Sequence, residues 1–230
     1  MPIPSNNSFF SAFILSILIC LCCTSASAED DGWDLRYSQD GLNVYTKYIK
    51  GAQVKSFRAE MVADAPMDLV LSVIKDVHHY PNWFHLCKSY EILQGSMNQG
   101  EYIGYYIVEA PWPLKDRDVY VKNVMQKDPD TQTVTILTNA VPDFEPVKDG
   151  LTRVPEVYGR WTFRPVSPDK TYIEFIGHGR PGGIIPVWIA NMVVTDVPKK
   201  TFLNLRSLLA DKETRQEYLL SGKTASNNGS

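Results

Sequence analysis

The sequence predicts an α+β domain in which an antiparallel sheet is covered on one side by a long C-terminal helix. Segments rich in Tyr, Ile, Val, Thr and Phe, residues that strands prefer, fill most of 42–178. One helical pattern interrupts these segments after Pro66, and a long helical pattern, 182–209, closes them. This order of a hairpin, a helix, a run of strands and a final helix is typical of a sheet that packs one face against helices.

The first 28 residues are predicted to be a secretory signal peptide rather than part of the fold. They contain no Asp, Glu, Lys or Arg, and 9–23 is an apolar run, shorter than the ~20 residues that a membrane-spanning helix needs. Ala26-Ser27-Ala28 supplies the small residues that a signal peptidase requires. We therefore expect cleavage near Ala28 and an exported protein, either periplasmic or secreted. The alternative is an N-terminal anchor that is not cleaved.

The remainder of the chain has the composition of one globular domain. The 202 residues after Ala28 suit a single domain, which we place at 29–214 and expect to be followed by a flexible tail, 215–230. The formal net charge is −3, which argues against nucleic acid as a partner. Only Cys87 remains after the signal segment, so no internal disulfide can form. The stability of the expected monomer must then come from its core.

The first elements of the domain are predicted to be a short helix, a hairpin and a second helix. The short helix is placed at Trp33-Asp34-Leu35. Two alternating runs, 42–49 and 54–62, are predicted to form the hairpin. The second helix has Asp64 as its candidate cap. The apolar stripe of that helix consists of Leu69, Val70, Val73, Ile74 and Val77.

The next part of the chain is predicted to be mostly strand. Turn clusters rich in Gly, Pro, Asp and Ser separate the strands. A longer loop with several Pro, Asp and Gly residues is expected at 142–155. The predicted strands are 89–93, 102–109, 119–126, 133–139, 159–164 and 172–178.

The closing helix is apolar on nearly all sides in its first half. Trp188, Ile189, Met192 and Val193 cover more than the single stripe of an ordinary surface helix. Pro198 removes a backbone donor and is predicted to kink the helix or to end its first part. Such a helix either covers a deep apolar groove or is a plain core helix, and the residues themselves leave both interpretations open.

Three short segments carry a family resemblance. Residues 110–120 read APWPLKDRDVY, residues 76–83 read DVHHYPNW, and residues 182–186 read GGIIP at the entry to the closing helix. In this order and spacing, from about Trp33 to Leu209, the chain resembles the START (steroidogenic acute regulatory-related lipid transfer) domains of the helix-grip superfamily.

This resemblance implies a curved antiparallel β-sheet wrapped around a long C-terminal α-helix, with an internal hydrophobic cavity. It implies that the protein binds one lipid-like molecule, of the sterol or phospholipid class, with transient membrane contact, and that it is not an enzyme. Several members of the family keep a buried acid–arginine pair in the cavity. Arg117 matches the arginine of the family pattern, and Glu109 is the nearest candidate for the acid.

Five residues are predicted to bind the ligand. Arg117 is expected to anchor a head group, because a guanidinium binds phosphate or carboxylate with two parallel hydrogen bonds. The alternative is that Arg117 and Asp118 form a structural pair between a strand and the neighbouring loop. The predicted cavity walls are Tyr106, Phe175, Trp188 and Met192.

No metal ion and no cofactor are expected. Three histidines and one cysteine, His78, His79, His85 and Cys87, lie within ten residues of the sequence. A metal site needs three or four converging ligands, however, and adjacent histidines point apart.

Two other classes of function remain as alternatives. An enzyme of cyclase or hydrolase type on the same fold would use Glu174, His178 or Glu109 as its acid or base. An interaction domain would instead have a cavity that its own side chains fill.

Overall fold

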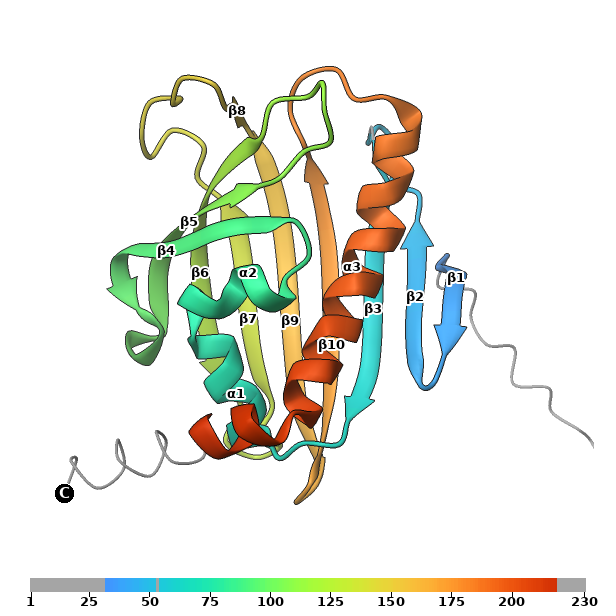
Figure 1. Ribbon diagram of the computed structural model, residues 1–230, viewed down its shortest axis with the longest axis vertical. Coiled ribbons are helices and arrows are strands. Elements are labelled where there is room, and N and C mark those ends of the chain that lie inside the picture. The colour runs from blue at the N-terminus through green and yellow to red at the C-terminus, as the bar shows by residue number, and fades with distance from the viewer. Residues whose placement is uncertain (1–31, 53, 219–230) are drawn as a thin grey trace, which may run out of the picture. The chain divides into compact units, whose positions relative to one another are not determined.

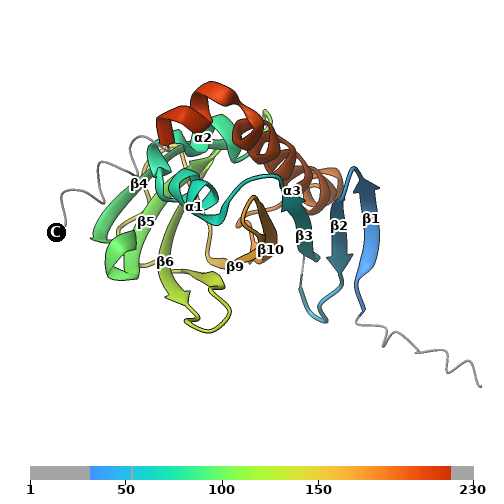
Figure 2. The same ribbon diagram turned by 90° about the horizontal axis from the view of Figure 1, so that it is seen from below.

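The structure is a computed structural model that describes residues 32–52 and 54–218. The predicted signal peptide and its cleavage site lie outside these residues. The described part forms one antiparallel sheet with a layer of helices on one face (Figures 1 and 2). This confirms the predicted fold class, a curved antiparallel sheet gripping a C-terminal helix. Within the described ranges, no helix is long and apolar enough to cross a membrane.

The sheet begins with three strands, β1 (Asp34–Gln39), β2 (Leu42–Lys47) and β3 (Ser56–Ala63), each paired with the next. The short helix predicted at Trp33-Asp34-Leu35 is wrong, because this segment leads into β1. Asp40 and Gly41, with φ of 49° and 74°, form the two-residue turn between β1 and β2. Positive φ at both positions is the geometry that Asp-Gly hairpins favour.

Three short helices follow, α1 (Met67–Lys75), η1 (Val77–His79) and α2 (Tyr80–Trp83). The predicted apolar stripe of α1 is buried from Leu69 to Ile74. Asp64 does not cap this helix: Pro66 is the N-cap residue, with no side-chain cap. The Asp64 carboxylate lies 2.6 Å from Lys170 Nζ instead.

The remaining strands complete the sheet in the order β1-β2-β3-β10-β9-β7-β6-β5-β4. Each neighbouring pair is antiparallel. A two-residue strand that the sequence did not predict, β8 (Thr152–Arg153), pairs in parallel with β6. The other strands are β4 (Cys87–Ser96), β5 (Glu101–Val108), β6 (Arg117–Lys127), β7 (Val134–Ala140), β9 (Glu156–Ser167) and β10 (Lys170–Arg180).

The closing helix, α3 (Val187–Ala210), continues through Pro198 as one element. The end predicted at this proline is therefore wrong. Pro198 removes one helical hydrogen bond, but side chains on both sides of it are buried against the sheet, Ile189 and Val194 before it and Phe202 after it. Tertiary packing thus offsets the local cost. Figure 2 shows α3 lying along the same face of the sheet as α1 and α2.

The two halves of α3 face different parts of the interior. Its second half packs on the main core, where Phe202, Leu205 and Leu209 contact the large side chains of the sheet, including Trp161 and Phe163. The first half lies over the opposite end of the sheet, where the packing leaves a cavity. The interpretation as a plain core helix therefore holds only for the second half.

A further helical segment, 212–218, follows α3. Its Tyr218 hydroxyl donates a hydrogen bond of 2.9 Å to Asp76 Oδ2, at the end of α1. The flexible tail that we predicted from residue 215 therefore does not include residues 215–218.

Candidate functional site

The cavity has a volume of about 200 Å³ and lies between the first half of α3 and the concave face of the sheet. Its walls are largely apolar side chains from β3, β5, β6, β9, β10 and α3, together with the segment between α2 and β4. They include Phe57, Phe84, Leu86, Val108, Val119, Val154, Val157, Ile189, Val193 and Val197. The cavity shows that side chains of the protein do not fill this part of the interior.

Strand β6 presents one charged residue to the cavity. Side chains alternate along a strand, so Arg117 and Val119 face the cavity while Asp118 faces the other side of the sheet. Asp118 is fully buried there, and its Oδ2 atom lies 2.8 Å from Arg153 Nη2. Arg117 and Asp118 therefore do not pair with each other. Each instead ties β6 to a neighbouring segment, Arg117 through the Lys115 carbonyl and Asp118 through Arg153.

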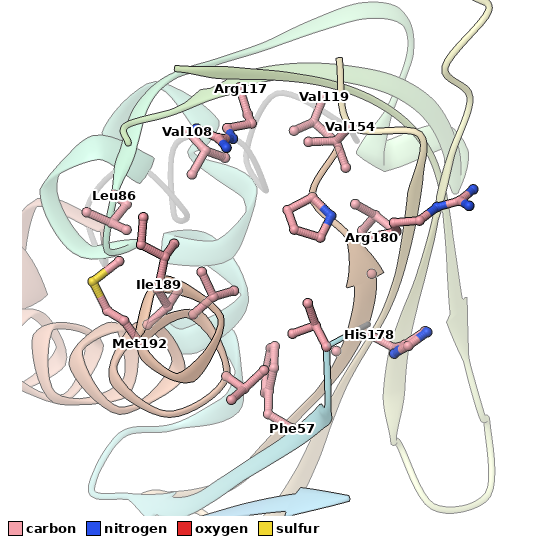
Figure 3. A pocket seen from close by; sticks show the side chains of 18 of the residues that line it. Phe57, Leu86, Val108, Arg117, Val119, Val154, His178, Arg180, Ile189 and Met192 are labelled. Carbon is pink, nitrogen blue, oxygen red and sulfur yellow. The ribbon is translucent and has the colours of Figure 1, made fainter. Parts of the chain in front are cut away.

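Arg117 is a buried cation at one end of the cavity (Figure 3). It is 8 % exposed, and its Nη1 atom donates a 2.5 Å hydrogen bond to the Lys115 carbonyl. Within the described part of the chain no carboxylate lies within ion-pair distance of it. Burial lowers the pKa of Arg117, an effect that nearby Asp116 partly offsets. The acid partner predicted at Glu109 is wrong, since Glu109 is exposed and makes no ion pair with Arg117.

The structure brings four of the five predicted ligand-binding residues to this one cavity. Tyr106 on β5, Phe175 on β10, Met192 on α3 and Arg117 on β6 all line it. Trp188 belongs to α3, but its side chain lies outside what the structure describes. Ligand binding by any of these residues stays a prediction.

Several wall residues are not predicted from the sequence, among them Phe57 and Leu86. Gly177 on β10 pairs with Phe57 on β3. A glycine within a strand indicates that a large neighbouring group lies close to the backbone, and this signal could have pointed to Phe57. A Cβ atom at Gly177 would overlap the Phe57 ring, so glycine leaves room for that ring beside the cavity. Leu86 has a φ of 66°, a backbone conformation that the sequence does not reveal.

Of the three residues proposed for catalysis, Glu109 and His178 are among those that line the cavity, and Glu174 is not. Glu174 Oε1 lies 3.3 Å from Arg160 Nη2, and Glu174 also accepts a hydrogen bond from Tyr172. The His178 ring lies 3.8 Å from Glu156, and Figure 3 shows it pointing away from the cavity, as Arg180 does. Neither Glu174 nor His178 is placed to act on a molecule beside Phe57.

The cluster of histidines and Cys87 is not assembled either. His79 Nδ1 lies 2.7 Å from Asp76 Oδ2, whereas Cys87 is buried and burial raises its thiol pKa to about 12. Over residues 32–52 and 54–218, no group of three or more His, Cys, Asp or Glu residues is arranged to hold a metal ion.

Two exposed apolar side chains stand near the same end of the fold as Arg117. Trp112, in the loop between β5 and β6, is 90 % exposed, and Ile184, in the loop between β10 and α3, is 94 % exposed. Both loops lie at the top of the view in Figure 1. Each of these loops therefore presents one large apolar side chain to solvent.

Comparison with known proteins gives consistent matches over most of the chain. The family model of the START domain matches residues 18–215. An uncharacterized protein from Pseudomonas aeruginosa is 31 % identical over 183 residues, covering 80 % of this chain and 88 % of its own length. The bovine phosphatidylcholine transfer protein is 26 % identical over 69 % of this chain and 75 % of its own length. The crystal structure of a STAR-related lipid transfer protein fragment from Xanthomonas axonopodis has a TM-score of 0.71 and 32 % identity, covering 79 % of this chain and 100 % of that fragment.

Proposed function

Since the chain belongs to the START domain family, whose members bind and transfer lipids, we propose that it binds a single lipid-like molecule beneath α3. The bound molecule places an anionic group, a carboxylate or a phosphate, beside Arg117. The observation that carries this proposal is a buried guanidinium, without a carboxylate partner among the described residues, at the end of an apolar cavity.

The electrostatics of Arg117 favour an anion. A buried charge is costly unless it is paired, and one carbonyl hydrogen bond satisfies only part of a guanidinium that has five N–H donors. A carboxylate or phosphate would accept two of the remaining donors side by side. The apolar walls would then bury the rest of the ligand, as in most small-molecule sites.

The first experiment is native mass spectrometry of the protein purified from its own host, followed by organic extraction of any bound molecule. We expect one anionic lipid per chain. Arg117→Met should lose this lipid, whereas Arg180→Met, which changes an arginine that points away from the cavity (Figure 3), should retain it. An empty wild-type protein that also fails to take up added fatty acids, or equal occupancy in both variants, would overturn the proposal.

The exposed loops are the parts that contact a membrane in this proposal. Trp112 and Ile184 would enter the lipid surface, and the backbone at Gly182 and Gly183, with φ of 73° and 65°, would act as a hinge at the start of α3. Replacing both apolar side chains by Ser should abolish sedimentation with phosphatidylcholine vesicles. Val166→Ser is the control, because Val166 is 50 % exposed near the turn between β9 and β10. An equal effect of this control would contradict the assignment.

We also propose that the mature protein acts as an exported monomeric carrier rather than an enzyme. The cavity is formed by one chain. Of the residues of the enzymatic alternative, Glu174 does not line it, and the His178 ring points away from it. N-terminal sequencing of the protein from the periplasm or medium tests export. A mature N-terminus near Glu29 is expected, and an intact Met1 in the cytoplasmic fraction would contradict it.

A further inference from the structure

A second, smaller cavity adjoins the first. It has a volume of about 70 Å³ and lies on the side toward α1 and α2. We call it the inner chamber, and the first cavity the outer cavity. Phe84, Tyr106, Val157 and Phe175 line both and form the wall between them. Three of these residues are held in strands, and Phe84 lies between α2 and β4, where its ring packs against Tyr80 and Trp83. A molecule that occupies both spaces therefore has to displace part of this wall.

The inner chamber contains a hydrogen-bonded cluster that spans three strands. Thr138 Oγ1 donates a bond of 2.7 Å to Asn123 Oδ1, and Asn123 Nδ2 donates a bond of 3.3 Å to the Tyr90 hydroxyl. Asn123 is only 3 % exposed. A side-chain amide offers two N–H donors and two carbonyl lone pairs. The two bonds therefore leave Asn123 one donor and one acceptor for a group that enters the chamber.

This chamber is electrically neutral. None of the described residues that line it carries a formal charge, and burial raises the pKa of Cys87 and of Tyr102 to about 12, so both stay protonated. A charged group brought here would lose its hydration without meeting an opposite charge. A hydroxyl or carbonyl group would instead exchange its bonds to water for bonds to Asn123.

Arg117 and Asn123 lie on the same face of the same strand. Along β6, Arg117, Val119, Val121 and Asn123 alternate with outward-facing residues and line one or the other space. Six residues of extended strand span about 20 Å. β6 therefore presents a cation at one end, two valines in the middle and a neutral amide at the other end.

From this arrangement we propose that the ligand is an elongated amphiphile with a polar group at each end. Its anionic group pairs with Arg117, its apolar body crosses the two valines, and a hydroxyl or carbonyl at its far end binds Asn123. The inference rests on the proposed function and adds a second polar subsite to it. It distinguishes this ligand class from lipids whose far end is purely hydrocarbon.

Matched probes test the inner subsite. Palmitate and ω-hydroxypalmitate differ only in a terminal hydroxyl, and cholanate and lithocholate give the same contrast on a rigid ring system. In titration calorimetry with wild-type protein, we expect the hydroxylated member of at least one pair to bind about tenfold more tightly, the effect of one hydrogen bond in a buried site. This also tells whether the apolar body is an acyl chain or a ring system.

The variants separate the two ends of the site. Asn123→Leu combined with Thr138→Val replaces two of the three bonded side chains by apolar groups and leaves the Tyr90 hydroxyl without its bond from Asn123. A folded double variant should lose the preference for the hydroxyl. Arg117→Met should weaken both members of a pair equally and leave their ratio unchanged. Ratios within twofold for both pairs in the wild type would overturn the inner subsite alone. No binding of any probe would overturn the proposed function with it.

Discussion

The ion pair between Asp118 and Arg153 is expected to be the most sensitive electrostatic contact outside the cavity. Its atoms lie 2.8 Å apart, and the side chains are 0 % and 9 % exposed. Asp118→Asn keeps the shape of the side chain and removes its charge, which leaves a buried arginine without its counter-charge. Breaking a buried pair in this way costs about 3–5 kcal/mol.

The structure places the expected loss at the lower end of this range. Arg153 also donates hydrogen bonds to the backbone carbonyls of Pro142, Glu145 and Pro146, and these bonds remain in the variant. We therefore expect a loss of about 3 kcal/mol in the free energy of unfolding. With a urea dependence of about 2 kcal/mol per molar, the unfolding midpoint would fall by about 1.5 M.

Urea unfolding followed by circular dichroism measures this shift, and an exposed pair supplies the control. Glu101 lies 2.7 Å from Lys122, but both side chains are about half exposed, so Glu101→Gln should cost less than about 1 kcal/mol. The double change of Asp118→Leu with Arg153→Met should recover much of the lost stability, because it removes both charges together. A midpoint for Asp118→Asn no lower than that for Glu101→Gln would refute the reasoning.

Three further predictions concern the cavity and the C-terminal segment. Met192→Trp should fill the outer cavity, so the folded variant should lose lipid in native mass spectrometry; unchanged binding would contradict a ligand beneath α3. Gly177→Ala should push the Phe57 ring aside and cost about 1–3 kcal/mol in urea unfolding; a neutral change would show that the ring moves freely. Burial opposes ionisation of Asp76, but hydrogen bonds from His79 and Tyr218 hold its pKa below the ordinary value. A carboxyl group whose pKa is lower in the folded than in the unfolded protein stabilises the fold at pH values above its unfolded pKa, about 3.9 for Asp. This stabilisation is lost as the pH falls through the pKa of the folded state. Thermal unfolding should therefore show Tyr218→Phe less stable than wild type at pH 7, with a difference that shrinks as the pH falls below about 4; a constant difference would exclude this linkage.

Periodicity was sufficient to predict most of the fold. The strands from β4 to β7, with β9 and β10, follow segments of high β propensity, and α1 follows its apolar stripe. The sequence does not predict β1, because the residues of this strand are largely exposed and carry no strong apolar alternation. The continuation of α3 through Pro198 depends on packing against strands from the other end of the chain, which no local pattern contains.

The site was predictable only in part, for the same reason. Arg117 and the residues near it could be found because they belong to one recognisable segment. Their surroundings could not, because alternation places Arg117 and Asp118 on opposite faces, but which of the two faces lines the cavity depends on where β6 lies in the sheet. The Asn123 cluster joins β4, β6 and β7, and no pattern within a single segment indicates that these residues meet.

The pairing of β3 with β10 has a consequence for how the chain acquires its structure. Thr171 on β10 donates a hydrogen bond to the Ala65 carbonyl, 106 residues away, and Asn204 on α3 donates one to the Trp83 carbonyl, 121 residues away. The first three strands therefore expose their apolar face until β10 and α3 are available, and contacts over such separations form slowly. The cavity is lined by β10 and by α3, so a chain that has not yet produced α3 has no complete cavity.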